Sequence, residues 1–151
     1  MQAAQGSLGR VFVLRLEDGD VVPDCIEQFA AENAIMGGYC ALLGGVGGGR
    51  LVVGPSDVEE DGDMDKIIPM VLPIRGIQEA AAVGTIFADS TGTPKLHMHT
   101  TLGRNDKVMT GCVRQGVNIW KIAEAVIFEI LDTGLCRKPD PVFGFDILSK
   151  D

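Results

Sequence analysis

A β-hairpin that contains both histidines of the chain constrains its fold more than any other feature. It runs from Lys95 to Cys112, with the sequence KLHMHTTLGRNDKVMTGC. The small polar residues GRND interrupt two runs that can alternate between the faces of a sheet, which is typical of two strands joined by a tight turn. Residues two apart in a strand point to the same side, so we expect His97 and His99 to share a face.

The position of the turn decides which residues of the two strands lie opposite each other. If Arg104 and Asn105 form the turn, Cys112 lies directly opposite His97. A slip of one residue would move Cys112 to the other face of the hairpin. The predicted register therefore places two imidazoles and one thiol on one side.

This group of side chains suits zinc, which accepts nitrogen and sulfur ligands and has no geometric preference from its d electrons. Three protein ligands, His97, His99 and Cys112, would leave a fourth position open, as catalytic zinc sites do and structural sites do not. The alternative is a pair of hydrogen-bonded histidines on a half-buried strand, with no metal. The spacing alone leaves both interpretations open.

The charge of the chain bears on nucleic acid binding. It carries 13 basic and 21 acidic residues, for a formal net charge of -8. DNA binding depends on clustered Lys and Arg side chains that displace counterions from phosphates, so direct DNA binding by this chain alone is disfavoured. The 20 glycines and the low aromatic content of 5% favour a sheet-rich fold over a helical bundle.

The length of 151 residues is typical of one domain, and we expect a single domain over residues 1–151 with its core from about residue 9 to residue 148. No apolar run is long enough for a membrane span, and the polar N-terminus lacks the apolar run of a signal peptide. A cytoplasmic protein is therefore expected. The four cysteines form no Cys-x-x-Cys pair, which predicts reduced thiols and no disulfide partner.

The remaining pattern predicts one helix among many strands. Apolar residues at helical spacing place the helix from Val22 to Asn33, with Asp20 as its cap. Strands are expected at residues 9–16, within 36–54 on both sides of a glycine run that forms a bulge or turn, and at 66–72, 74–88 and 142–148. Residues 125–131 fit either a helix or a buried strand.

Several stretches resemble the plants-and-prokaryotes conserved (PPC) domain in its stand-alone prokaryotic form. The likeness begins at GRVFVLRLEDGD, residues 9–20, and continues through GGVGG, residues 44–48. It is sharpest from LHMHTTLGR, residues 96–104, to AEAVIFEIL, residues 123–131. The stretches occur in the family's order and cover nearly the whole domain.

The resemblance implies a site and a fold. Prokaryotic relatives have Gly-Gly-His where this chain has Thr110-Gly111-Cys112, so Cys112 takes the place of the family's third histidine and keeps a zinc-competent ligand. The implied fold is α/β (α+β), with a curved, largely antiparallel sheet and few helices, related to the acetolactate decarboxylase fold and assembled as a homotrimer. It makes residues 125–131 a strand.

The resemblance also implies two functions. The first is a homotrimeric, zinc-binding cytoplasmic domain of undetermined biochemical role that acts by self-association or by contact with a partner; the family carries a DNA-binding and regulatory label, which ranks below the other two functions for this chain. Plant members owe that role to AT-hooks, of which Arg75-Gly76 is only a fragment. The second is a zinc-dependent lyase or hydrolase acting on a small carbonyl compound, in which Glu79 or Glu124 shuttles protons beside the open metal position. A surface position is the alternative for Glu79.

Overall fold

A computed structural model of the chain describes residues 1–56, 68–114 and 116–150. It contains one helix, α1 (Asp24–Glu32), and eleven strands. The strands are β1 (Ser7–Glu17), β2 (Val21–Val22), β3 (Gly37–Gly48), β4 (Arg50–Pro55), β5 (Pro69–Pro73), β6 (Gln78–Ala88), β7 (Pro94–Arg104), β8 (Lys107–Val113), β9 (Val117–Leu131), β10 (Leu135–Pro139) and β11 (Asp146–Lys150).

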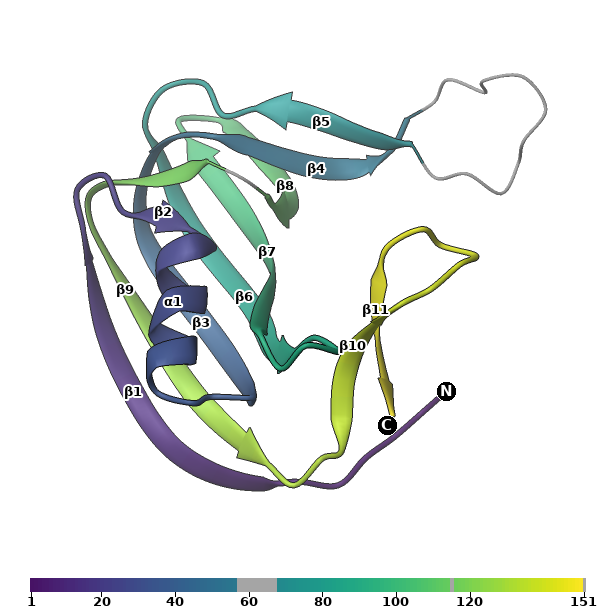
Figure 1. Cartoon of the computed structure of the whole chain (residues 1–151). Coiled ribbons are helices and arrows are strands. Elements are labelled where there is room, and N and C mark those ends of the chain that lie inside the picture. Colours follow the sequence, from purple (N-terminus) through teal and green to yellow (C-terminus); the bar gives the residue numbers. More distant parts are fainter. Residues whose placement is uncertain (57–67, 115, 151) are drawn as a thin grey trace.

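Nine of the strands form one curved sheet, and α1 covers one of its faces (Figure 1). The order along the sheet is β1-β9-β3-β6-β7-β8-β4-β5, with β2 paired to β9, and the pairs within it are antiparallel. β10 and β11 form a separate antiparallel hairpin. The predicted fold class, a curved antiparallel sheet with one helix, is confirmed. No helix in the described residues is both long and apolar enough to cross a membrane.

Buried and exposed side chains alternate along the central strands β6 and β7, which gives the sheet a buried face and an outer face. In β7, Leu96, Met98 and Leu102 are buried while His97 and His99 are exposed. The buried face packs against Ile26 and Ala30 of α1, among other residues, in one apolar core. The core therefore lies between the sheet and the helix, and the histidines lie on the side away from it.

The helix forms where its apolar spacing predicts, but its cap differs. Ile26 and Ala30 are fully buried, whereas the N-cap position is Pro23, which makes no side-chain capping hydrogen bond. Asp20 instead accepts a hydrogen bond from the backbone N–H of Glu17 at 2.8 Å. The predicted cap is wrong because β2 separates Asp20 from the helix and pairs with β9.

The glycine run interrupts regular pairing, as predicted. The register between β3 and β9 shifts between Gly44 and Val46 and again before Gly48. Gly44 has a φ of 146°, and a Cβ atom there would lie 2.5 Å from the Cα atom of Ala123. A side chain at this position would both strain the backbone and collide with β9, so glycine is required at this bulge.

Residues 125–131, whose sequence fits either a helix or a strand, form a strand in the structure. Residues 125–131 belong to β9, which pairs with β1 on one side and β3 on the other. The terminal strand predicted at 142–148 lies later, at Asp146–Lys150. Asp140 accepts hydrogen bonds from the backbone N–H groups of Val142 and Phe143 and thereby holds these residues in a turn. The strand predicted at 66–72 begins outside the described residues, and its described part is β5.

A buried carboxylate ties β1 to β9. Glu129 is 5% exposed and receives hydrogen bonds from the backbone N–H, Nε and Nη2 of Arg10, at 2.6 to 2.9 Å. The same Nη2 also donates to the carbonyl of Asn33, just after α1. Hydrogen bonds from the side chain of Arg10 lower the pKa of Glu129 to about 2. One guanidinium thus joins the edge strand β1 and its neighbour β9 to the end of the helix.

We expect Glu129→Gln to lower the free energy of unfolding at pH 7 by about 2 kcal/mol, the scale of hydrogen bonds to a charged group. Because folding lowers the pKa of Glu129, this contribution is complete above about pH 5 and is lost as the pH falls toward 2. Urea unfolding at pH 7 and pH 2.5 measures both values. Glu17→Gln, which removes an exposed ion pair with Arg15, serves as the control. An equal loss for Glu129→Gln at both pH values would contradict this assignment.

Candidate metal centre

The histidine hairpin forms with its turn one residue later than predicted. Asn105 and Asp106 are the turn residues, and Asn105 has a φ of 56°. Asparagine tolerates this left-handed conformation better than most residues, which explains why the turn begins there. As a result Cys112 lies opposite His99 instead of His97.

The corrected register keeps all three side chains on the same face. When a two-residue turn moves by one position, each residue pairs with a partner two positions further along the opposite strand. Because side chains alternate with a period of two, each residue stays on the same face. His97 and His99 of β7 and Cys112 of β8 therefore share the outer face of the sheet. The predicted grouping holds although the predicted partner was wrong.

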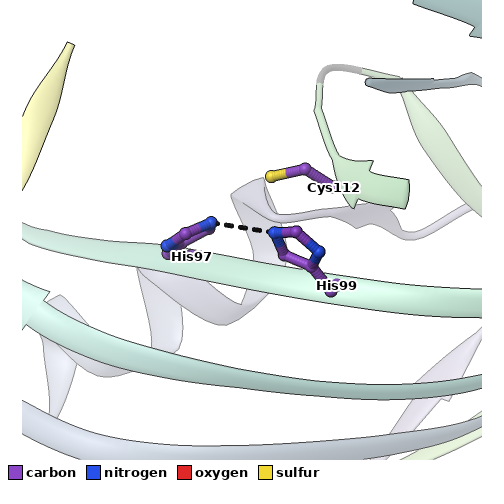
Figure 2. Close-up of side chains that lie close together, drawn as sticks. All are labelled: His97, His99 and Cys112. Carbon is purple, nitrogen blue, oxygen red and sulfur yellow. Dashed lines mark hydrogen bonds between the residues drawn. The ribbon is translucent and has the colours of Figure 1, made fainter. Parts of the chain in front are cut away.

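The potential ligand atoms of His97, His99 and Cys112 all lie within 4.8 Å of one another. The two Nε2 atoms are 3.1 Å apart and form a hydrogen bond. Figure 2 shows both imidazoles projecting from β7 and the thiol reaching toward them from β8. No other group of three or more potential ligands is found in the described residues.

These distances can be compared with what zinc requires. Bond lengths of about 2.0 Å to nitrogen and 2.3 Å to sulfur in a tetrahedron place two nitrogens about 3.3 Å apart and nitrogen and sulfur about 3.6 Å apart. The histidine pair already has this spacing, and an adjustment of about 1 Å brings the thiol into range. The donor set and its spacing therefore fit zinc, which His97, His99 and Cys112 would hold with three protein ligands.

Burial and nearby charges control ionisation at the cluster. The pKa of His97 is lowered, first by burial and then by the positive charges of Arg137, His99 and Arg114. Burial raises the pKa of the Cys112 thiol, and the same two arginines partly oppose this shift. A neutral imidazole is ready to bind a metal, whereas the thiol has to lose its proton to do so.

The two candidate proton shuttles are not brought to this cluster. Glu79 lies on β6, four residues from Val83, the partner of His99, which corresponds to about 13 Å along the strand. Glu124 lies on β9, three strands away from β7, or about 14 Å across the sheet. Both carboxylates are exposed on the outer face of the sheet.

Glu79 belongs to a separate groove on the molecule. This open groove of about 430 Å³ is lined by residues that include Glu79, Arg104 and Trp120. The Trp120 side chain packs close to Gly45, the partner of Glu79 in β3. The role predicted for Glu79 beside the metal is therefore not supported by its position.

Sequence reasoning missed the two arginines next to the cluster. Arg137 is 7% exposed, and its Nη2 donates hydrogen bonds to the backbone carbonyl and the hydroxyl of Thr85. Thr85 is the partner of His97 in the pairing of β6 with β7. Arg137 is far from the histidines in sequence and comes near them only through the β10–β11 hairpin, so no local pattern could have identified it.

One known domain family matches most of this chain. The Plants and Prokaryotes Conserved (PCC) domain matches residues 3–131, which is more than half of the chain. The chain belongs to the PCC domain family. The family suggested by the residue motifs is thus confirmed, and the match includes the whole histidine hairpin. Among curated proteins, none matches this chain.

Solved structures share the fold along nearly the whole chain. A metal-containing protein from Archaeoglobus fulgidus is 20% identical, with a TM-score of 0.82, covering 99% of this chain and 100% of its own. A plant- and prokaryote-conserved protein from Pyrococcus horikoshii is 22% identical, with a TM-score of 0.81 and coverage of 100% and 99%. A Bacteroides thetaiotaomicron protein described as a "putative DNA-binding protein" is 17% identical, with a TM-score of 0.75 and coverage of 95% and 96%.

Proposed function

We propose that this chain is a cytoplasmic, single-domain PCC protein that binds zinc through His97, His99 and Cys112 and works as a homotrimer. The observation that carries the metal assignment is the grouping of two imidazoles and one thiol within 4.8 Å on one face of the sheet. The description of the Archaeoglobus fulgidus neighbour as metal-containing supports it. Nitrogen and sulfur donors favour zinc over the hard ions magnesium and calcium.

The open fourth position supports a second candidate function, a zinc-dependent lyase or hydrolase acting on a small carbonyl compound. When bound, zinc would polarise a carbonyl oxygen or lower the pKa of a water molecule. His97, His99 and Cys112 would hold the ion and leave the exposed side for substrate. Proton transfer would then require a group other than Glu79 and Glu124, because both lie well outside hydrogen-bonding range of the cluster.

The metal assignment predicts about one zinc ion per chain after purification and loading, measured by elemental analysis and by competition with a chromophoric chelator. We expect His97→Ala and His99→Ala each to weaken zinc binding by about 100-fold or more, since each removes one of three protein ligands. Cys112→His should retain zinc because imidazole replaces thiolate as a ligand.

Cys25→Ala provides the matched control for loss of a thiol. Cys25 is a half-buried thiol on α1 that packs against the core, away from the outer face. Its removal should leave the zinc content unchanged. Zinc content that does not change in the two histidine variants would exclude this site.

Self-association is supported by an apolar outer strip, which we define as Val11, Val13, Tyr39, Leu43, Val83 and Phe128. These side chains are 37% to 75% exposed. They lie on adjacent strands: Val13 is joined through Val126 and Ala41 to Val83, and Val11 through Phe128 to Tyr39. A contiguous apolar surface of this kind is typical of a protein interface.

The outer strip continues directly into the candidate metal centre, because Val83 is the partner of His99. We therefore propose that further copies of the chain cover the strip and approach the cluster. Burial against a partner would remove the apolar surface from water, which is worth about 25 cal/mol per Å².

Substitution of two apolar residues of the strip by lysine tests this proposal. We expect the double variant Val13→Lys and Leu43→Lys to shift the mass in solution from about three chains toward one, because lysine ammonium groups resist burial in an apolar interface. Light scattering coupled to size exclusion gives the mass. Val142→Lys, at an exposed valine in the turn before β11, is the control and should not change the mass. Monomeric wild-type protein would overturn the trimer.

We also propose that this chain does not bind DNA by itself, in contrast to the description of the Bacteroides thetaiotaomicron neighbour. The formal net charge of -8 opposes association with phosphates. We expect no retardation of an AT-rich duplex at physiological salt in a gel-shift assay. Retardation that weakens steeply as the salt concentration rises would contradict this expectation and indicate contacts with phosphates.

A further inference from the structure

A buried, unpaired arginine lies beside the candidate metal centre. Arg137 is 7% exposed and makes no ion pair in the part of the chain that the structure describes. Its Nη2 donates to the carbonyl of Thr85 at 3.3 Å and to the hydroxyl at 3.1 Å, while its buried Nε has no hydrogen-bond partner among the residues that the structure describes. A buried donor without a partner is uncommon in folded proteins and indicates an unfilled contact.

The contacts of Arg137 place it next to His97. Side chains directly opposite each other in antiparallel strands have Cβ atoms about 5 Å apart, and Thr85 and His97 are such a pair. The guanidinium that binds Thr85 is therefore beside the imidazole of His97. In agreement, the positive charge of Arg137 lowers the pKa values of both His97 and Cys112.

The local charge at this site is opposite to that of the whole chain. Arg114 is an exposed residue two positions after Cys112, and its charge acts on His97 and Cys112 in the same sense as that of Arg137, so two cations lie near a cluster within a protein of net charge -8. Burial lowers the pKa of Arg137, and the charges of Asp146 and Glu27 only partly oppose this shift; neither carboxylate lies within the 4.0 Å of an ion pair with Arg137. Burying a charge without a partner is costly, which favours an anion here.

We propose that Arg137 and the metal position form a two-point site for a small oxyanion, a carboxylate or a phosphate. The inference rests on the proposed function, since His97, His99 and Cys112 hold the ion that takes one oxygen. Zinc with one thiolate carries a net charge of +1, to which the arginines add theirs. The planar guanidinium donates to the second oxygen in the geometry that carboxylates and phosphates prefer.

A purely structural role for Arg137 explains only part of these contacts. Its hydrogen bonds to Thr85 fasten β10 to β6, next to the bridge between Asp89 and Arg137. Figure 1 shows β10 running past the end of β6. Fastening the hairpin accounts for Nη2 but not for Nε.

Cobalt provides a readout that does not depend on activity. Protein loaded with Co²⁺ absorbs visible light through its metal and thiolate transitions, and an anion that binds to the metal changes these bands. We would titrate the loaded protein with acetate in one arm and inorganic phosphate in the other, at constant ionic strength. The arm with the tighter binding identifies which oxyanion the site prefers.

We expect Arg137→Gln to weaken binding of the preferred anion by about tenfold or more, which is the effect of one charge-assisted hydrogen-bonded pair. Arg137→Lys should fall between this variant and the wild type, because it keeps the charge but not the fork of donors. Arg15→Gln is the control, since Arg15 is an exposed arginine on β1 that pairs with Glu17, and it should bind anions as the wild type does.

The outcomes separate the two proposals. Cobalt binding with anion affinity that Arg137→Gln leaves unchanged overturns the anion site but leaves the metal site intact. Absence of cobalt binding in the wild type overturns both. If Arg137→Gln fails to fold, Arg114→Gln is the second variant, for which about threefold weaker binding is expected from loss of a more distant charge; unchanged affinity in that variant overturns the proposal.

Discussion

Pairing of β7 between β6 and β8 is the constraint on which the rest of the structure depends. Both ladders are antiparallel; the ladder with β6 runs unbroken through both histidines, and the ladder with β8 begins at the pair of His99 and Cys112. They fix which side chains face the core, so that Met98 fills it while His97 and His99 point away. The same period of two that buries one set of residues therefore presents the other set as potential ligands. The fold and the candidate site are two consequences of one register.

Close approach of the backbones supports this register. A Cβ atom at Gly84, the partner of Met98, would lie 2.6 Å from the carbonyl oxygen of His97. Glycine at this position lets β6 and β7 come together under the cluster without a collision. Thr85 follows directly and places its hydroxyl and carbonyl where Arg137 can reach them. Two neighbouring residues of β6 thus serve both the backbone contact and the arginine.

Alternation and spacing predicted the parts of the molecule that depend on local pattern. These parts are β1, the helix α1 with its spacing of apolar residues, the glycine bulge, and the shared face of His97, His99 and Cys112. The turn was misplaced because Arg104 and Asn105 differ in their tolerance of positive φ, a preference that alternation does not report. The strand at residues 125–131 needed the family resemblance, since its outward-facing residues Val126, Phe128 and Ile130 are also apolar and the sequence therefore shows no alternation of apolar and polar residues there. Arg137 could not be predicted, because only the tertiary path of the β10–β11 hairpin brings it to the site.

Cysteine at position 112, where the family resemblance implies a third histidine, changes the electrostatics of the proposed centre. A zinc ion with three neutral imidazoles carries a charge of +2, whereas one thiolate reduces it to +1 and weakens its attraction for an anion. Burial raises the pKa of Cys112, so ionisation of this thiol needs positive charge close by. Arg137 and Arg114 supply that charge, and it acts in two ways. It would stabilise the thiolate in a zinc complex, and it would restore the attraction for an oxyanion that the thiolate reduces. The substitution at residue 112 and the two arginines are therefore best understood as parts of one electrostatic arrangement.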